Sequence, residues 1–134
     1  MNGTSIMVLS LIPRSKFDLE AANRIVNAGY PAVKPVLSEL LEWLQDYNWP
    51  VAKVLAPFLA GIGSPLIAHI DHVFSTSDDT WKYWMIVCLI SRNDDLFAHY
   101  KPKLIQYAEN PSDSDKHHEL DEVSRDALTE KGIY

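Results

Sequence analysis

Asp78 and Asp79 come closest in this chain to an acid–base pair, and they stand just before Trp81 and Lys82. Adjacent carboxylates at a helix start usually cap its free N–H groups and interact favourably with the helix dipole. A catalytic pair would also need a carboxyl group whose pKa is raised by burial. The polar turn before them, rich in Ser, Thr and Asp, does not promise such burial. We therefore expect Asp78 or Asp79 to cap a helix.

The histidines suggest metal chemistry but lack the spacing for it. His69 and His72 are three residues apart with Asp71 between them, so a helix would place both imidazoles near one face. A zinc site needs at least a third protein ligand, and none follows at a diagnostic spacing. His117 and His118 are adjacent, and neighbouring helical residues point about 100° apart. We predict no metal site and no cofactor.

Nucleophilic chemistry has one thiol available, Cys88, which lies in the apolar run Met-Ile-Val-Cys-Leu-Ile. Such a cysteine is typically a buried, inert thiol, and a single cysteine cannot form an intramolecular disulfide. No nucleophile elbow, glycine-rich phosphate loop or paired-cysteine motif is present. We therefore expect a protein that is not an enzyme. Sequence order alone leaves a Ser-His-Asp or Cys-His triad open.

The net charge of the chain limits its expected partners, and its length limits the number of domains. The 134 residues carry a formal net charge of −6, and the basic residues are scattered. No basic patch is available to neutralise several phosphates, so we expect no nucleic-acid partner. An acidic surface suits solubility or a basic protein partner. A chain of this length is predicted to form a single domain over residues 1–134.

The first residues include an apolar run from Ile6 to Ile12. The run is too short to span a bilayer, and no positive residue precedes it, so we predict neither a signal peptide nor a membrane anchor. Residues 1–12 are interpreted as a lead-in segment and residues 13–131 as the helical core. Met7 is an alternative start. We expect the protein to be cytoplasmic.

Apolar residues recur at helical spacing through most of the chain, and no segment alternates with period two, which predicts an all-α fold. One helix is expected from residue 17 to 28 and another from about 115 to 130. Others are expected to start with Pro35, with Pro50 after an Asn48 cap, with Pro65 after a Ser64 cap, and near Asp78. Pro57 falls inside a helix and should bend it.

The prolines also indicate a repeat. Pro35, Pro65 and Pro102, which are 30 and 37 residues apart, are each followed by apolar residues and are predicted to open a helix. Between them, Trp49 and Trp81 each stand at the entrance to the second helix of a pair. Repeated helix–turn–helix units of this length are typical of HEAT-like arrays, in which stacking buries the apolar face that one pair cannot cover. The sequence therefore favours a short array of about three helix pairs over an irregular helical bundle.

Three stretches carry a family resemblance: residues 12–19 (IPRSKFDL), 41–52 (LEWLQDYNWPVA) and 78–84 (DDTWKYW). They resemble a family of small bacterial proteins classed as a domain of unknown function. The resemblance extends from about Leu11 to Leu128. It implies a short HEAT-like helical protein and transfers no catalytic or binding residues.

The sequence hypothesis is a non-enzymatic protein-binding module, of immunity or adaptor type, with a basic protein partner. Turn residues would lie along one edge of the array and form the contact surface, with a tryptophan at a turn as an anchor. The predicted contact residues are Asp46, Tyr47, Trp49, Asp78, Asp79, Lys82 and Tyr83. The alternative is a small hydrolase-like or ligand-binding enzyme that uses turn carboxylates on a concave face.

Overall fold

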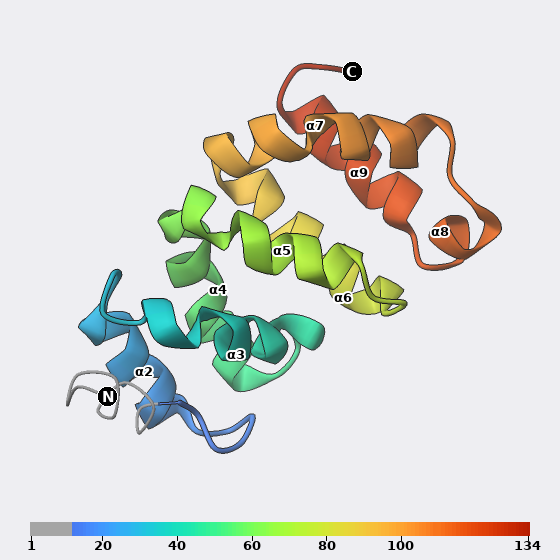
Figure 1. The fold of residues 1–134 in the computed structure, drawn as a ribbon. Helices are drawn as coiled ribbons and strands as arrows, with labels where there is room; N and C mark the ends of the chain where they lie inside the picture. Colours follow the sequence, from blue (N-terminus) through green and yellow to red (C-terminus); the bar gives the residue numbers. More distant parts are fainter. Residues whose placement is uncertain (1–11) are drawn as a thin grey trace.

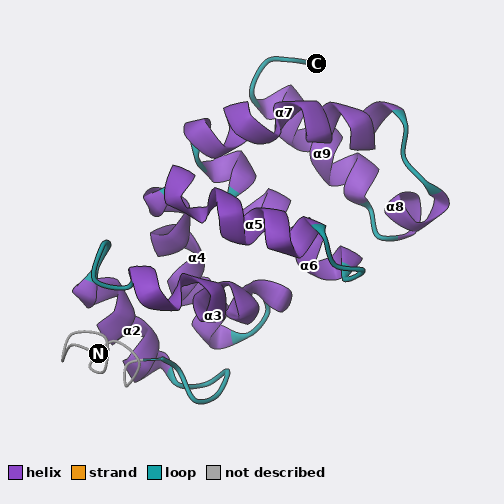
Figure 2. Ribbon diagram, viewed as in Figure 1, coloured by secondary structure: helices purple, strands orange, loops and turns teal. Residues whose placement is uncertain are grey.

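The computed structural model describes residues 12–134, and these form helices joined by short turns, with no β-strand among them (Figure 2). The prediction of an all-α fold is confirmed. Most of the expected lead-in segment, and Met7 with it, lies outside the described residues. The α-helices are α2 (Leu19–Ala28), α3 (Leu37–Glu42), α4 (Pro50–Ile62), α5 (Ile67–Phe74), α6 (Asp79–Cys88), α7 (Asp94–Glu109), α8 (Asp113–His117) and α9 (Leu120–Glu130).

Short 3-10 turns extend several of these helices. They are η1 (Lys34–Val36), η2 (Trp43–Gln45), η3 (Ser64–Leu66) and η4 (Ile90–Arg92). In Figure 1, α3, α5 and α7 lie in front, with α6 behind α5 and α9 behind α7. α4 contacts α6, and α6 contacts α9, so these helices follow one another along the molecule. α2 covers α4 at the N-terminal end.

One hydrophobic core runs through all of these α-helices except α8 and includes Leu40, Leu55, Ile70, Met85 and Leu104. Burial of such aliphatic side chains contributes roughly 25 cal/mol for each Å² of apolar surface removed from water. The helix α6 sits centrally and contributes Trp81, Met85, Ile86 and Cys88 to this core, as its nearly continuous apolar sequence indicates.

Polar side chains of later helices also bind the carbonyl groups of earlier ones. The indole Nε1 of Trp81 donates to the carbonyl of Leu41 at 3.0 Å. The amide of Asn93 donates to the carbonyl of Ala60 at 2.8 Å. These bonds reach carbonyl groups near the C-terminal ends of α3 and α4, where the backbone hydrogen bonds within a helix run out. They therefore fix successive helices against one another.

The helix starts confirm some predicted caps and correct others. Asp78 accepts a hydrogen bond from the Trp81 amide at 3.0 Å, so it is the cap of α6. The predicted Asn48 cap is wrong: Trp49 occupies the N-cap position of α4 and forms no side-chain cap bond. Pro50 is the first residue of the helix and forces the residue before it into an extended conformation. The predicted Ser64 cap is also wrong, because Ser64 lies inside η3 and Gly63 precedes it.

Two predicted helix boundaries are wrong in the C-terminal half. Pro102 does not open a helix but lies inside α7, which begins after the Asn93 cap. Pro102 is exposed, so the carbonyl one turn back can bond to water. The helix expected from 115 to 130 is two helices, because Glu119 adopts a left-handed conformation (φ 61°) between α8 and α9. This turn places Leu120 in the core.

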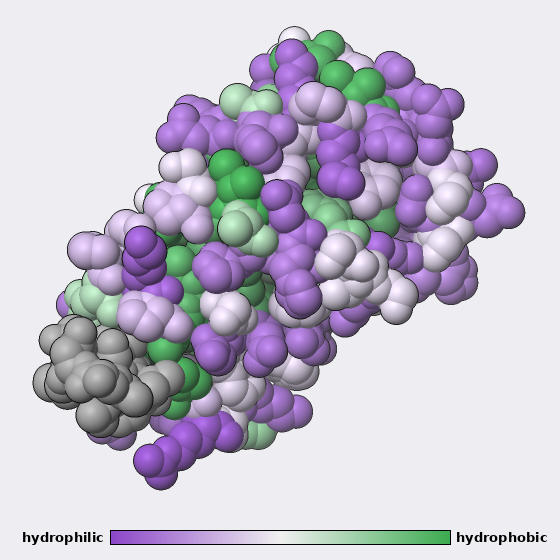
Figure 3. All heavy atoms as spheres, in the orientation of Figure 1, coloured by the Kyte–Doolittle hydropathy of each residue, from purple (hydrophilic) through white to green (hydrophobic). Residues whose placement is uncertain are grey.

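Within residues 12–134 no single helix is long and apolar enough to cross a membrane. The segments Pro50–Ile62 and Ser64–Phe74 meet that requirement only when taken together, and they are bent by 110°. On the face seen in Figure 3, hydrophilic residues cover most of the surface over α7 and α8. Hydrophobic residues show there mainly as patches between the helices.

Candidate functional site

The two aromatic residues in the turn between η2 and α4 pack against different partners. Asp46 accepts a hydrogen bond from the backbone N–H of Asn48 at 2.8 Å, which closes the turn. The ring of Tyr47 packs on Trp84 of α6, with centroids 5.5 Å apart. The ring of Trp49 instead packs edge-on against Trp43, 5.9 Å away. Of these turn residues, Tyr47 is therefore the one that reaches α6.

The turn before α6 holds a link to α8. The carboxylate of Asp79 accepts hydrogen bonds from Lys82 Nζ at 2.9 Å and from Ser114 Oγ at 2.7 Å. His118 Nδ1 lies 3.4 Å from the same carboxylate. The side chains of Asp79 and Lys82 are only 11% and 13% exposed. Both side chains are thus largely occupied within the molecule: Asp79 fixes α8 against α6, and Lys82 pairs with Asp79 inside α6.

The pKa of Asp79 in this link is shifted in the opposite direction from that of a catalytic acid. Burial raises the pKa of the Asp79 carboxyl, but the hydrogen bonds from Ser114 and Lys82 outweigh it, so the pKa lies below its usual value. Ser114 donates its hydroxyl to Asp79, while His118 Nδ1 lies 2.9 Å from the backbone carbonyl of Ser114. The histidine is therefore not placed as the base of this hydroxyl, as a nucleophilic triad requires.

His69 and His72 line a shallow hollow between α3 and α5 together with Ser38, Leu41, Val73 and Trp81. None of these residues is an acid, and the hollow is mostly apolar. In the part of the chain that the structure describes, no three His, Cys, Asp or Glu side chains are placed to hold a metal ion.

An aromatic cluster connects two of the predicted contact residues. Tyr83 packs edge-on against Trp84 with centroids 4.9 Å apart, and Tyr47 packs against the same indole at a tilt of 36°. All three side chains are half-buried. The structure thus brings Tyr47 and Tyr83 together through Trp84. The sequence interpretation did not identify Trp84 as the connection.

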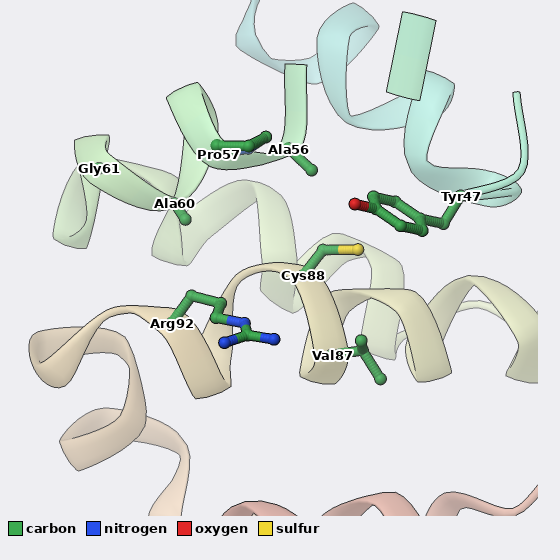
Figure 4. A pocket seen from close by; sticks show the side chains of 8 residues that line it. All are labelled: Tyr47, Ala56, Pro57, Ala60, Gly61, Val87, Cys88 and Arg92. Carbon is green, nitrogen blue, oxygen red and sulfur yellow. The ribbon is translucent and has the colours of Figure 1, made fainter. Parts of the chain in front are cut away.

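Beside this cluster, a pocket of about 520 Å³ opens between α4 and α6 (Figure 4). Its walls are mainly apolar and consist of Tyr47, Ala56, Pro57, Ala60, Gly61, Val87, Cys88 and Arg92. Figure 4 shows the hydroxyl of Tyr47 and the guanidinium of Arg92 directed into the space between the two helices. The sequence did not predict this pocket, because its residues are contributed by two segments about 30 positions apart.

The Cys88 thiol and the Arg92 guanidinium, both in the pocket wall, differ in their chemical state. Burial raises the pKa of the Cys88 thiol to about 12, so the thiol stays protonated at neutral pH and is a poor nucleophile. Arg92 is exposed, and among residues 12–134 no carboxylate lies within ion-pair distance of its guanidinium. Arg92 therefore keeps its hydrogen-bond donors free at the mouth of the pocket.

A second hollow continues this surface between α6 and α9. Val87 and Arg92 line both, and the second one adds Tyr83, Asp126 and Glu130. We use the term acidic stripe for the exposed residues Glu119, Glu122, Asp126 and Glu130, whose spacing places them along one side of α9. This regular spacing is visible in the sequence and is the signal that the sequence interpretation missed.

The acidic stripe contributes to the electrostatic environment of Tyr83 in the aromatic cluster. The pKa of Tyr83 is raised, first by burial and then by the nearby charges of Glu119 and Asp126. The negative potential at this point of the surface favours cations. The pocket, the aromatic cluster and the acidic stripe therefore form one continuous face over α4, α6 and α9, which we call the binding face.

Comparison with known proteins identifies a matching family but indicates no function. The sequence model of a family described as a domain of unknown function (DUF5071) matches residues 11–128. No curated protein matches the chain.

Proposed function

Because the chain belongs to this family of unknown function, we propose a role from its own surface: it is a non-enzymatic protein-binding module. We further propose that its helices form a short HEAT-like array of about three pairs, α3 with α4, α5 with α6, and α7 with α9. The succession of α4, α6 and α9 supports this arrangement. So do the bonds that join Trp81 to Leu41 and Asn93 to Ala60. Such arrays present extended surfaces for partners.

The observation that carries the proposal is the binding face, where an apolar pocket and half-buried aromatic rings adjoin the acidic stripe. Aromatic residues beside a pocket are the usual anchors of protein interfaces. A row of like charges speeds the association of an oppositely charged partner and sets its orientation. With a net charge of −6, the chain suits a basic partner. We propose an immunity or adaptor role in a bacterial cytoplasm.

The contact is centred on Tyr47 and Tyr83 among the seven turn residues predicted from the sequence. Both lie half-buried at the edge of the binding face. Asp78 caps α6, Asp79 holds α8, and Lys82 pairs with Asp79. Replacement of these three residues would therefore disturb the fold as well as any contact, which makes them poor probes of binding.

Charge reversal in the acidic stripe tests the proposal. The tagged double variant Glu122→Lys/Asp126→Lys is compared with the wild-type chain by cross-linking and affinity purification from the native host. We expect a basic protein to be recovered with the wild-type chain and to be lost with the double variant. The matched control is Glu42→Lys, which reverses an exposed charge at the end of α3 and should leave recovery unchanged. Equal recovery by all three, or recovery of no protein by any, contradicts the proposal.

A further inference from the structure

The pocket between α4 and α6 has the size and walls of a site for one large apolar side chain. Its volume of about 520 Å³ falls within the range of roughly 300–1,000 Å³ that is usual for small-ligand sites. Ala56, Ala60 and Gly61 form one wall from α4, and their small side chains leave the space open. Pro57, Val87 and the neutral thiol of Cys88 add apolar surface. An aromatic ring that enters this pocket would be buried among apolar groups and would need no charged group of its own.

The surroundings of the pocket restrict what else the occupant carries. Val87 and Arg92 lead from the pocket into the neighbouring hollow, which is bordered by Asp126 and Glu130. These two carboxylates outnumber the single positive charge of Arg92 in this hollow, so they oppose a ligand that is itself an anion and favour a cation beside the apolar group. A second copy of this chain would present another net charge of −6, which makes it a poor occupant of this face.

We propose that the pocket receives one aromatic or large aliphatic side chain from a segment of the protein partner, and that a Lys or Arg beside it in that segment pairs with Asp126 or Glu130. This inference rests on the proposed function and names the recognition element. Arg92, which has no carboxylate of residues 12–134 within ion-pair distance, donates to the backbone carbonyl groups of the bound segment. The recognised motif is thus an apolar anchor next to a basic residue.

Gly61 offers a way to close the pocket without disturbing the fold. Gly61 lines the pocket in the last turn of α4, and a Cβ atom placed there meets nothing within 4 Å. Gly61→Leu should therefore fill the space from one wall, while Gly61→Ala adds one methyl group and leaves the space open. Because alanine and leucine both favour helix over glycine, neither variant should unfold more easily than the wild-type chain.

The experiment uses a random peptide library displayed on phage and selected on the wild-type chain. We expect the selected peptides to share a Trp, Phe or Leu with a Lys or Arg within two positions. A synthetic peptide of the selected sequence is then titrated against the variants. Its affinity should fall about tenfold or more with Gly61→Leu and with Asp126→Lys/Glu130→Lys, as is usual for loss of an interface anchor. It should stay near the wild-type value with Gly61→Ala.

Other outcomes are decisive as well. Selected peptides without an apolar anchor, or equal affinity for Gly61→Leu and Gly61→Ala, would overturn the pocket as the recognition element. Selected peptides in which acids flank the anchor would overturn the pairing with Asp126 or Glu130. The proposed function can survive either result, since it is tested separately by recovery of the host partner with Glu122→Lys/Asp126→Lys. Loss of the host partner there, together with full binding to Gly61→Leu, would keep the function and reject the pocket.

Discussion

Two glycines at the end of α4 have opposite structural roles. Gly61 has helical geometry with open space at its Cβ position, whereas Gly63 has φ 76° and lies against Asn93. A Cβ atom at Gly63 would come within 2.9 Å of the Asn93 side-chain nitrogen. That nitrogen donates to the carbonyl of Ala60, and the oxygen of the same amide caps α7. Gly63 therefore permits the close approach through which α4 and α7 are joined.

We expect Gly61→Ala to stabilise the protein by roughly 0.5–1 kcal/mol, because alanine loses less backbone freedom in a helix than glycine. We expect Gly63→Ala to destabilise it by about 2 kcal/mol, because of the left-handed backbone and the displaced Asn93 amide. Urea denaturation followed by circular dichroism measures both free energies of unfolding. Two variants of equal stability would show that the Asn93 side chain moves away at little cost and that Gly63 is not required at this position.

The indole of Trp81 provides a second test at the residue scale. Its Nε1 donates to the carbonyl of Leu41 in a buried setting, so Trp81→Phe removes a buried hydrogen bond between α6 and α3. We expect a loss of roughly 0.5–1.5 kcal/mol in the free energy of unfolding, the usual net contribution of one hydrogen bond. Trp49→Phe is the matched control, since the Trp49 ring is half-buried against Trp43. A similar loss in both variants would attribute the effect to ring size alone.

At the scale of helices, α8 depends on one carboxylate. α8 has only five residues, none of them buried, and so short a helix is not stable by itself in water. Its capping box, in which Ser112 and Asp115 bond each other's backbone, fixes only the first turn. The bond from Ser114 to Asp79 holds α8 against α6. α8 should therefore loosen when Asp79 loses its charge.

This dependence predicts an effect of pH. The pKa of Asp79 in the folded protein lies below its usual value of 3.8, so its ionised form stabilises the fold above that pH. The contribution is lost as the pH falls below 3.8 and passes through the folded pKa. Asp79→Asn should destabilise the protein by roughly 1–3 kcal/mol at pH 7. The difference from the wild-type chain should shrink below pH 3.8.

Hydrogen exchange locates the effect of that substitution. In Asp79→Asn, amides of α8 should exchange faster than those of α7, because the link to α6 is weakened. Asp113→Asn, at an exposed position in the same helix, is the control and should leave the exchange of α8 nearly unchanged. A difference in stability between Asp79→Asn and the wild-type chain that stays constant with pH would show that the charge of Asp79 is irrelevant.

The helices themselves were largely predictable from the sequence, because apolar spacing reports which side of a helix is buried. The predicted helix cap was confirmed for Asp78 and was wrong for Ser64. Ser64 lies inside a 3-10 turn, and a serine by itself does not indicate such a turn. Pro102 was predicted to start a helix, but it lies inside α7 on the exposed side. A proline there destabilises the helix less than one that faces the core. The break at Glu119 required tertiary packing of Leu120.

The candidate site shows the same limit at a larger scale. The individual residues Tyr47 and Tyr83 could be singled out from the sequence, since aromatic residues at turns are typical of interfaces. The pocket could not, because it depends on how far apart α4 and α6 are held. The acids of α9 have a regular spacing, but only the contact between α6 and α9 places them beside Tyr83. Proximity of this kind arises from packing and has no local signal in the sequence.

For the whole molecule, the arrangement of helices implies a C-terminal element that closes the core. α9 contacts both α6 and α7 and buries Leu120, Val123, Ala127 and Leu128. A helix that covers two neighbours on one side and is polar on the other buries their apolar faces and presents charge to water. The acidic stripe is the polar side of α9. The same helix therefore serves both stability and the proposed contact.

Removal of α9 should consequently unfold more than the segment removed. A chain ending at Asn110 leaves the apolar sides of α6 and α7 exposed, and we expect it to aggregate or to melt without a cooperative transition. The control chain ends at Glu130, which removes four exposed or half-buried residues. With them go the side-chain bonds from Lys131 to Asp94 and from Tyr134 to Glu109, and three backbone bonds to the last turn of α9. It should unfold cooperatively, within about 1 kcal/mol of the full chain. A soluble, cooperatively folded chain ending at Asn110 would mean that the core is complete without α9, and the stacking of three pairs would have to be abandoned.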